Sequence, residues 1–303
     1  AQVVAAYGRH LRIRDAASGV EHEARPFGRR LEVVCGDVVR CERDPAHDEI
    51  HVLEVLPRRS ALHRSNARGA AEIVVANVTL IAVVVAPRPT PDLFVVDRYL
   101  CAAASSGIRA LLVLNKLDLD GAAALRESLA HYESAGYEVL GVAARESLNV
   151  DALSAALVGE TGVLLGQSGV GKSSLVSRLA PAATGVATGD LVRGEEGRHT
   201  TTSSRLYDLP GGGHLIDSPG VRDFAPAIQA LEPACLGFVE VDRLAPGCRF
   251  GDCRHMAEPG CAVRDAAASG HLEARRYESY RRMRRLFEDL KAAQGPGRHA
   301  PTR

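Results

Sequence analysis

A nine-residue stretch at 166–174 has the residue types and spacing of a phosphate-binding loop. Its sequence, GQSGVGKSS, fits the pattern G-x-x-x-x-G-K-S/T. An apolar run precedes it and a helical pattern follows, so backbone N–H groups and the positive end of a helix dipole should converge on an anion. We expect a nucleoside triphosphate here, with Lys172 reaching its β and γ phosphates and the Ser173 hydroxyl coordinating Mg²⁺. A glycine-rich turn without a ligand is the alternative. The residues expected to contact the nucleotide are Gly166, Gln167, Ser168, Gly169, Val170, Gly171, Lys172, Ser173 and Ser174.

The segment NKLD, which directly follows the apolar run at 110–114, predicts which base is bound. A carboxylate at Asp118 can accept hydrogen bonds from N1–H and the exocyclic amine of guanine, with Asn115 and Lys116 beside it. Adenine has an acceptor at N1 and no amine at that place, so the carboxylate would stay unpaired at a cost in binding free energy. The four-residue pattern is weak alone. At the end of a predicted strand, in a chain with a phosphate-binding loop, it indicates GTP and GDP.

A second acidic segment, DSPG at 217–220, follows another short apolar run. We expect Asp217 to support the Mg²⁺ ion through water. The Gly220 amide is placed to bind the γ-phosphate. The pair would therefore report whether the third phosphate is present.

The threonine cluster GRHTTT at 197–202 has the polarity of a switch loop. One hydroxyl should complete the Mg²⁺ shell when the γ-phosphate is present, and we favour Thr201, with Thr200 as the alternative. Val221 stands where many GTPases have a glutamine that orients the attacking water, and valine cannot do so. His199 is therefore our candidate to position the water. A surface or phosphate-contacting histidine is the other interpretation.

The order of these segments differs from the usual GTPase order. NKLD precedes the phosphate-binding loop and DSPG comes last. This indicates a circularly permuted domain, which a parallel sheet tolerates when its strands keep their neighbours. DSPG then leads directly into the C-terminal part of the chain, which we take as a route from nucleotide state to that part.

The C-terminal part holds four metal-ligating residues within 14 positions: Cys248, Cys253, His255 and Cys261. Three thiolates and an imidazole suit one tetrahedral Zn²⁺ with no open position, which would be structural rather than catalytic. The seven cysteines are an odd count, and their crowding argues against a secreted disulfide framework.

Composition is that of an ordinary globular protein, with 303 residues, 46% hydrophobic and 24% charged. Lys+Arg and Asp+Glu both number 37, so net charge does not indicate nucleic acid. Positions 271–303 carry nine basic against four acidic residues, which suits either a phosphate backbone or a solvated helix face. No signal-peptide pattern or membrane-length apolar run is present, and we expect a cytoplasmic protein without membrane contact.

The pattern of elements predicts a multi-domain protein. Residues 1–66 read as an N-terminal OB-type β-barrel, with strands expected at 2–6, 10–15, 32–34, 37–42 and 49–56, although another small β-domain would fit. Residues 67–225 alternate apolar strands with helices, as in a doubly wound α/β GTPase domain. Residues 226–303 form the expected zinc-binding domain with its closing helix.

The chain resembles one family closely, the circularly permuted ribosome small-subunit-dependent GTPases, or RsgA. The phrases carrying the resemblance are GDVV (36–39), RRSALHRS (58–65), VVANVTLIAVVVA (74–86), PDLFVVDRYL (91–100), VLNKLDL (113–119), GQSGVGKSSL (166–175), GRHTTT (197–202), DSPGVRDF (217–224) and CRFGDCRHMAEPGCAV (248–263). The resemblance implies a protein that docks on the 30S ribosomal subunit and its 16S rRNA. It also implies action late in maturation of the subunit and GTP hydrolysis stimulated by it. We expect a monomer.

The resemblance also extends to particular residues. It implies that the histidine before the threonines, His199, supports hydrolysis. The loop that would cap guanine has Ala143 where the family usually has serine. A backbone amide at Ala143 or Ala144 can still meet the guanine oxygen, but a stabilising hydroxyl is missing and affinity should be lower.

Three other functions fit parts of the sequence. The chain could be a GTP-gated RNA- or ribosome-binding module with incidental hydrolysis, which Val221 favours and His199 disfavours. It could be a permuted GTPase of the large ribosomal subunit, which the zinc segment and the barrel disfavour. A kinase with a phosphate-binding loop is disfavoured by NKLD.

Overall fold

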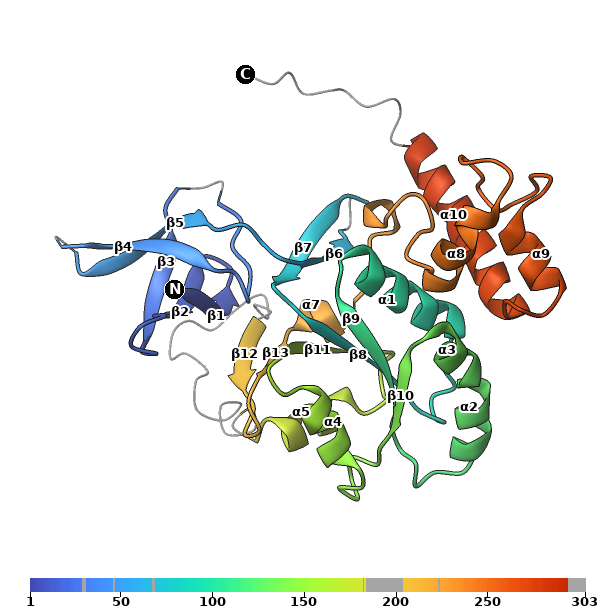
Figure 1. Ribbon diagram of the computed structural model, residues 1–303. Coiled ribbons are helices and arrows are strands. Elements are labelled where there is room, and N and C mark those ends of the chain that lie inside the picture. The colour runs from blue at the N-terminus through green and yellow to red at the C-terminus, as the bar shows by residue number, and fades with distance from the viewer. Residues whose placement is uncertain are drawn as a thin grey trace.

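The computed structural model describes residues 1–28, 31–45, 47–66, 69–181, 183, 204–222 and 224–293. Figure 1 shows a β-rich N-terminal region, a central sheet flanked by helices, and a C-terminal group of helices. The expected switch-loop residues His199, Thr200 and Thr201 lie outside the described residues. Among the helices of the described ranges, none is both long enough and apolar enough to span a bilayer.

The N-terminal strands curl around a small apolar core. In space they follow the order β1-β2-β3-β5-β4, and only β3 and β5 run parallel. A bridge from Gln2 to Val38 and a hydrogen bond from the Val39 amide to the Ala1 oxygen bring the start of β4 back to β1. The strands are β1 Gln2–Tyr7, β2 His10–Arg14, β3 Glu21–Pro26, β4 Val39–Asp44 and β5 Glu49–Val55.

Five strands were expected in this region, and one expectation was wrong. Residues 32–34 form no strand, whereas Glu21–Pro26 does. Only Ala24 of that strand is fully buried, so its sequence lacks the apolar alternation that indicates a strand. The OB assignment itself stays a prediction.

The central sheet has the layout of a doubly wound α/β domain. Five strands run parallel in the order β10-β9-β8-β11-β13, and β12 pairs antiparallel at the β13 edge. In space, β11 lies between β8 and β13 although β8, β9 and β10 precede it in the chain. These strands are β8 Leu80–Val85, β9 Arg109–Leu114, β10 Glu138–Gly141, β11 Thr161–Leu165, β12 Ser204–Asp208 and β13 His214–Asp217.

Helices cover both faces of this sheet, because its central strands are apolar on both sides. All six residues of β8 are buried, and alternate ones belong to two different cores. One core contains α4 and α5, and the other contains α1 and the C-terminal helices. The helices of the domain are α1 Leu93–Ser105, α2 Ala122–Ser128, α3 Ala130–Ala135, α4 Val150–Ala156, α5 Lys172–Leu179 and α7 Pro219–Arg222.

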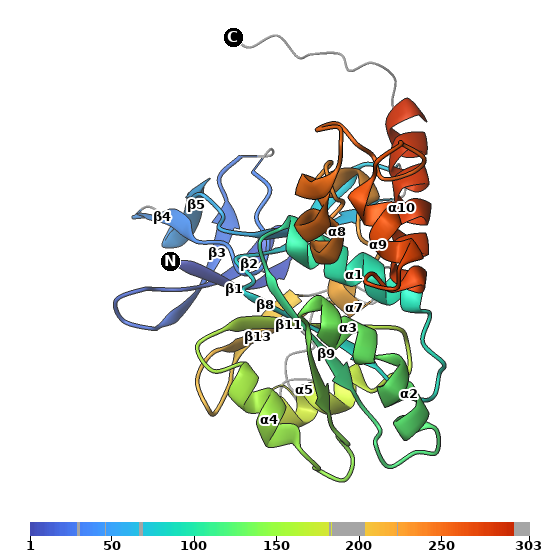
Figure 2. The same cartoon turned by 45° about the vertical axis from the view of Figure 1, so that its right-hand side comes forward.

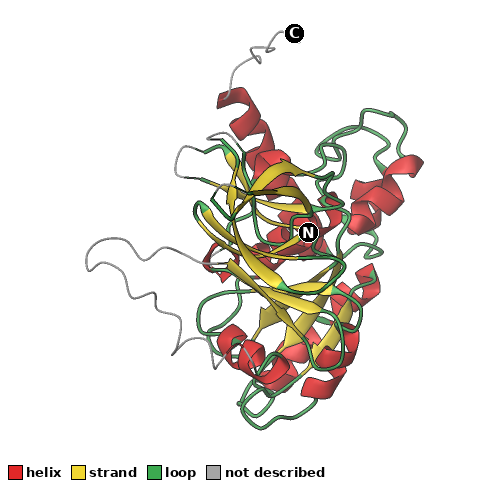
Figure 3. Cartoon of the chain, turned by 90° about the vertical axis from the view of Figure 1, so that its left-hand side faces the viewer, coloured by secondary structure: helices red, strands yellow, loops and turns green. Residues whose placement is uncertain are grey.

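One continuous sheet joins the N-terminal strands to the central domain. The antiparallel pairing of β1 with β12 extends the sheet to eleven strands among the described residues, and Figure 3 shows these strands running through the middle of the molecule. A separate hairpin of β6 Ala61–Ser65 and β7 Ala71–Ala76 lies between the two regions in sequence. The predicted domain boundary at 66/67 falls between these two strands.

The segment at 35–37 also packs the N-terminal region against the central domain. Gly36 has a φ of +92°, and its oxygen accepts a hydrogen bond from the Asn77 side chain. A Cβ at this position would lie 2.0 Å from the Ala76 oxygen. Asp37 is fully buried, and Arg58 donates to it at 2.6 and 2.9 Å.

The C-terminal helices are held on α1 by buried charges. They are α8 Val239–Leu244, α9 Ala262–Ala268 and α10 Ala274–Ala293, with short 3-10 turns at Ile228–Ala230 and Ala245–Gly247. Arg276 of α10, 1% exposed, donates to Asp97 of α1 at 2.7 Å and to Glu240 of α8 at 2.5 and 2.9 Å. Figure 2 shows α10 and α8 beside α1. Removing one partner of such a network leaves a buried charge uncompensated, so the network fixes how the regions pack.

The close contact at Gly36 predicts how strongly the packing between the N-terminal region and the central domain depends on this glycine. Gly36→Ala should lower the free energy of unfolding by roughly 3 kcal/mol or more, because it adds a backbone clash to the cost of a left-handed conformation. Gly8→Ala is the matched control, since Gly8 has a φ of +64° and open space around its Cα. It should cost only about 1 kcal/mol. Denaturant unfolding of both variants measures the difference, and equal losses would show that the junction is not tightly packed.

Candidate guanine-nucleotide site and metal centre

The phosphate-binding loop connects β11 to α5 through glycines that no other residue could replace without strain. Gly166, Gly169 and Gly171 have φ values of 146°, 83° and 101°. A Cβ on Gly166 would lie 2.3 Å from the Val84 oxygen, and one on Gly171 would lie 2.2 Å from the Asn115 Nδ2. The loop therefore needs glycine both for its conformation and for its close packing against β8 and NKLD.

Asn115 is the residue that joins the separate segments of the site. It follows β9, is 1% exposed, and its Nδ2 donates to the Val170 oxygen at 2.9 Å. Its Oδ1 accepts from the Ala144 amide at 3.1 Å. The side chain thus holds the phosphate-binding loop on one side and the loop after β10 on the other.

Two lysines stabilise the same loop through its carbonyl groups. The Lys116 ammonium donates to the Arg88 and Gly169 oxygens at 2.8 and 2.7 Å, and the Lys172 ammonium donates to the Gly166 and Gln167 oxygens at 2.5 and 2.9 Å. The chain has only three lysines among its 37 basic residues, and two of them are here. A compact ammonium with three donors fits between two carbonyls better than a planar guanidinium does.

A cavity of about 490 Å³ opens between these segments. Three cations and one carboxylate line it, which favours an anionic ligand. Asp118 is exposed at the cavity. The lining residues are Asn115, Lys116, Asp118, Leu119, Ala144, Arg145, Ser168, Gly169, Gly171, Lys172, Ser173 and Ser174.

Most of the predicted nucleotide contacts lie together around this cavity, but four do not line it. Gly166 and Gln167 lie at the start of the loop, where the Gln167 Oε1 accepts from the Asp92 amide at 3.2 Å. Val170 is 1% exposed and belongs to the core beneath α5. Ala143 is fully buried, and its backbone pairs with Leu148.

Two lining residues, Leu119 and Arg145, were not among those expected from the sequence. Each directly follows a predicted segment, NKLD or the Ala143–Ala144 pair. The Ala143 amide donates to the Leu148 oxygen, and the Ala144 amide donates to Asn115 Oδ1. The next amide in the chain, that of Arg145, is therefore the one available to a ligand.

Asp217 and Gly220 lie next to the phosphate-binding strand rather than in the cavity lining. β13, which ends at Asp217, pairs in parallel with β11, so the ends of both strands meet at the same edge of the sheet. Ser218 is 2% exposed, and its hydroxyl accepts from Ser204 at 2.7 Å. A Cβ on Gly220 would lie 2.6 Å from Val74 Cγ1, so a larger residue there would displace the Val74 side chain.

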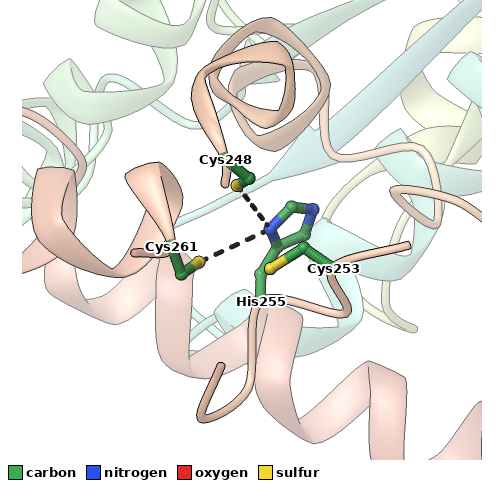
Figure 4. Close-up of side chains that lie close together, drawn as sticks. All are labelled: Cys248, Cys253, His255 and Cys261. Carbon is green, nitrogen blue, oxygen red and sulfur yellow. Dashed lines mark hydrogen bonds between the residues drawn. The ribbon is translucent and has the colours of Figure 1, made fainter. Parts of the chain in front are cut away.

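The four predicted metal ligands converge in the C-terminal region. Their ligand atoms lie within 4.8 Å of one another, and Figure 4 shows three sulfur atoms around the His255 ring. Cys248 Sγ and Cys261 Sγ lie 3.4 and 3.6 Å from His255 Nδ1. A tetrahedral zinc ion with bonds of about 2.3 Å to sulfur and 2.0–2.1 Å to nitrogen requires ligand atoms roughly 3.6 Å apart. The geometry of the donor set therefore fits zinc.

The loop that carries His255 is held from α10 and by one carboxylate. The Tyr277 hydroxyl donates to the His255 oxygen at 2.8 Å, and the Tyr280 hydroxyl donates to the Arg254 oxygen at 2.9 Å. Glu258 accepts hydrogen bonds from three backbone amides of the loop. Burial would raise the pKa of Glu258, but these amide donors outweigh it and lower the pKa to about 2. The carboxylate is thus ionised and orders the turn.

Comparison with known proteins shows what this chain is similar to. A model of the RsgA GTPase family matches residues 55–226. The small ribosomal subunit biogenesis GTPase RsgA of Chromohalobacter salexigens is 45% identical over 230 residues, 74% of this chain and 67% of the relative. The protein of the same name from Azotobacter vinelandii is 47% identical over 236 residues, 76% of this chain and 68% of the relative.

Two solved structures share the fold along nearly the whole chain. YjeQ from Thermotoga maritima superposes with a TM-score of 0.72 at 26% identity and covers 98% of both chains. YloQ, described as a circularly permuted GTPase, superposes with a TM-score of 0.70 at 22% identity and covers 95% of this chain and 94% of its own. The motif order, the sheet in which β11 lies between β8 and β13, and these matches agree, and the chain belongs to the RsgA family of circularly permuted GTPases.

Proposed function

We propose that this GTP hydrolase acts late in maturation of the small ribosomal subunit and that the subunit stimulates its hydrolysis. The observation that carries the nucleotide part is the Asn115 side chain, which joins the phosphate-binding loop to the predicted guanine loop around one cavity. The relatives' names support the ribosomal part. The 16S rRNA as contact, the monomeric state and the cytoplasm as location belong to the same proposal.

Separate parts of the cavity would bind the base and the phosphates. Asp118 would accept from the guanine N1–H and amine, since it lines the end of the cavity that NKLD forms. Lys172 would leave the loop carbonyls for the β and γ phosphates of bound GTP, and the loop amides would hold them. Ser173 would supply a hydroxyl to Mg²⁺, the ion that neutralises charge on the phosphates.

Hydrolysis would depend on residues at the β13 end of the site. Asp217 would support the Mg²⁺ shell through water, the Gly220 amide would bind the γ-phosphate, and Thr201 or Thr200 would complete the shell. Val221 is 2% exposed and packs in the core on the α1 side. Its side chain cannot reach a substrate water, which supports His199 as the positioning group.

One zinc ion would be held by Cys248, Cys253, His255 and Cys261. The ion would supply a structural cross-link, because four protein ligands leave no open position for substrate. The chain's own contribution is the support of the loop by Tyr277, Tyr280 and Glu258.

Replacing Asp118 tests the assignment of the base. Asp118→Asn should exchange the preference for guanine for one for xanthine, because an amide can donate to the oxygen that replaces the exocyclic amine. Asp120→Asn is the control, since Asp120 is exposed in the same loop and does not line the cavity. Affinities for GDP and xanthosine diphosphate measure the exchange. An Asp118→Asn protein that still selects GDP would contradict the assignment.

Metal analysis of purified variants tests the zinc site. The wild-type chain and Cys41→Ala should each carry about one zinc, because Cys41 lies in β4, away from the cluster. Cys253→Ala should carry far less, because three ligands hold the ion poorly. Equal zinc content in the two variants, or none in the wild type, would rule the site out.

GTP turnover with and without purified 30S subunits tests the proposed function, with 50S subunits as the control. We expect 30S alone to raise the rate strongly. Stimulation by 50S instead would assign the chain to the large subunit. A slow rate unaffected by either particle would favour a GTP-gated binding module, the function that the buried Val221 suits.

A further inference from the structure

The helix that follows the phosphate-binding loop also contacts the loop next to the base end of the cavity. Arg178, in the last turn of α5, donates from Nε to the Ala144 oxygen and from Nη2 to the Arg145 oxygen, both at 3.1 Å. A guanidinium presents such parallel donors in a fixed fork, so two successive carbonyls are gripped by one side chain.

These two bonds orient amides as well as carbonyls. In a planar trans peptide, the C=O and the N–H of the same unit point in opposite directions. When Arg178 draws the Ala144 oxygen toward α5, the Arg145 N–H is directed away from α5. Ala144 and Arg145 both line the cavity, and the amides of Ala143 and Ala144 already donate to Leu148 and Asn115. The Arg145 amide is therefore the one that this contact prepares for a ligand.

Paired backbone groups of Ala143 and Leu148 close the turn, and two side chains orient its 144–145 part. Ala143 ends in a methyl group and cannot supply a hydrogen bond from its side chain. Asn115 holds the turn from the β9 side and Arg178 holds it from the α5 side. Arg178 also lies six positions after Lys172, about 9 Å along the helix at 1.5 Å per residue. One rigid helix thus fixes the base loop relative to the phosphate-binding loop.

We propose that Arg178 is a positioning residue for guanine, which holds the 144–145 turn so that the Arg145 amide meets the 6-oxo group of the base. The proposal rests on the proposed guanine-nucleotide site. Arg178 itself does not line the cavity. It acts through the turn, and its effect falls on recognition of the base rather than on the hydrolytic step.

The test compares two ligands that differ at the 6 position. Affinities for GDP and for 2-aminopurine riboside diphosphate, which lacks the 6-oxo group, are measured on the full chain with Arg178→Ala. GDP should bind roughly three- to tenfold more weakly, the range of one or two hydrogen bonds, while affinity for the analogue stays nearly unchanged. The KM for GTP should rise by a similar factor with kcat unchanged.

Two further variants make the comparison decisive. Arg178→Lys, which can still donate to one carbonyl, should recover part of the loss. Arg126→Ala removes an exposed arginine that pairs with Glu133 on α2 and α3, away from the cavity, and should change neither affinity. If Arg178→Ala lowers the affinity for both ligands equally, or lowers the affinity for neither, the proposal is overturned. If the wild type shows no preference for GDP over ADP, the proposed nucleotide site fails instead.

Discussion

The buried side-chain amide of Asn115 is the contact on which the nucleotide site depends. It donates to the phosphate-binding loop and accepts from the loop after β10. Gly171 packs so closely against it that a Cβ on Gly171 would collide with the Asn115 amide. Each such hydrogen bond adds only about 0.5–1.5 kcal/mol, but a buried amide left unpaired costs about 1–3 kcal/mol. The arrangement is therefore favourable only when the three segments meet, which makes them one site.

The sheet explains how a reordered chain builds that site. The carboxyl ends of β9, β10, β11 and β13 meet at one edge, so the segments following them approach one another whatever their order in the chain. The same sheet continues through β12 into β1, and Ser204 at the start of β12 bonds to Ser218 beside Asp217. The sequence suggested a route from DSPG to the C-terminal helices. The structure adds a direct connection from this segment to the N-terminal strands.

Much of the central domain could be predicted from local pattern, and the omissions have physical causes. The apolar runs before NKLD and before the phosphate-binding loop indicated β9 and β11, because parallel strands buried on both faces leave a strong signal. β12 was missed, since only Leu206 of its five residues is buried and its pairing with β1 is a long-range contact. The helical region after NKLD is divided into α2 and α3 at Leu129, a break that no proline or glycine marks in the sequence.

The residues of the candidate site also differ in whether the sequence alone could predict them. Motif spacing located the phosphate-binding loop, NKLD and the cysteine cluster, because each is a compact local pattern. Leu119, Arg145 and Arg178 carry no pattern of their own, and only the folded chain brings them to the cavity or to its supporting turn. An amide at Ala143 or Ala144 was expected at the base, but these amides donate to Leu148 and Asn115, which leaves the Arg145 amide as the candidate.

Calorimetric titration of the full chain with GDP and with ADP, both with Mg²⁺, tests most directly the claim that these segments form one guanine-nucleotide site. The account predicts one GDP bound per chain, with affinity at least about a hundredfold above that for ADP, since ADP leaves the Asp118 carboxylate unpaired. Equal affinity for the two nucleotides, or no binding of GDP, would contradict it.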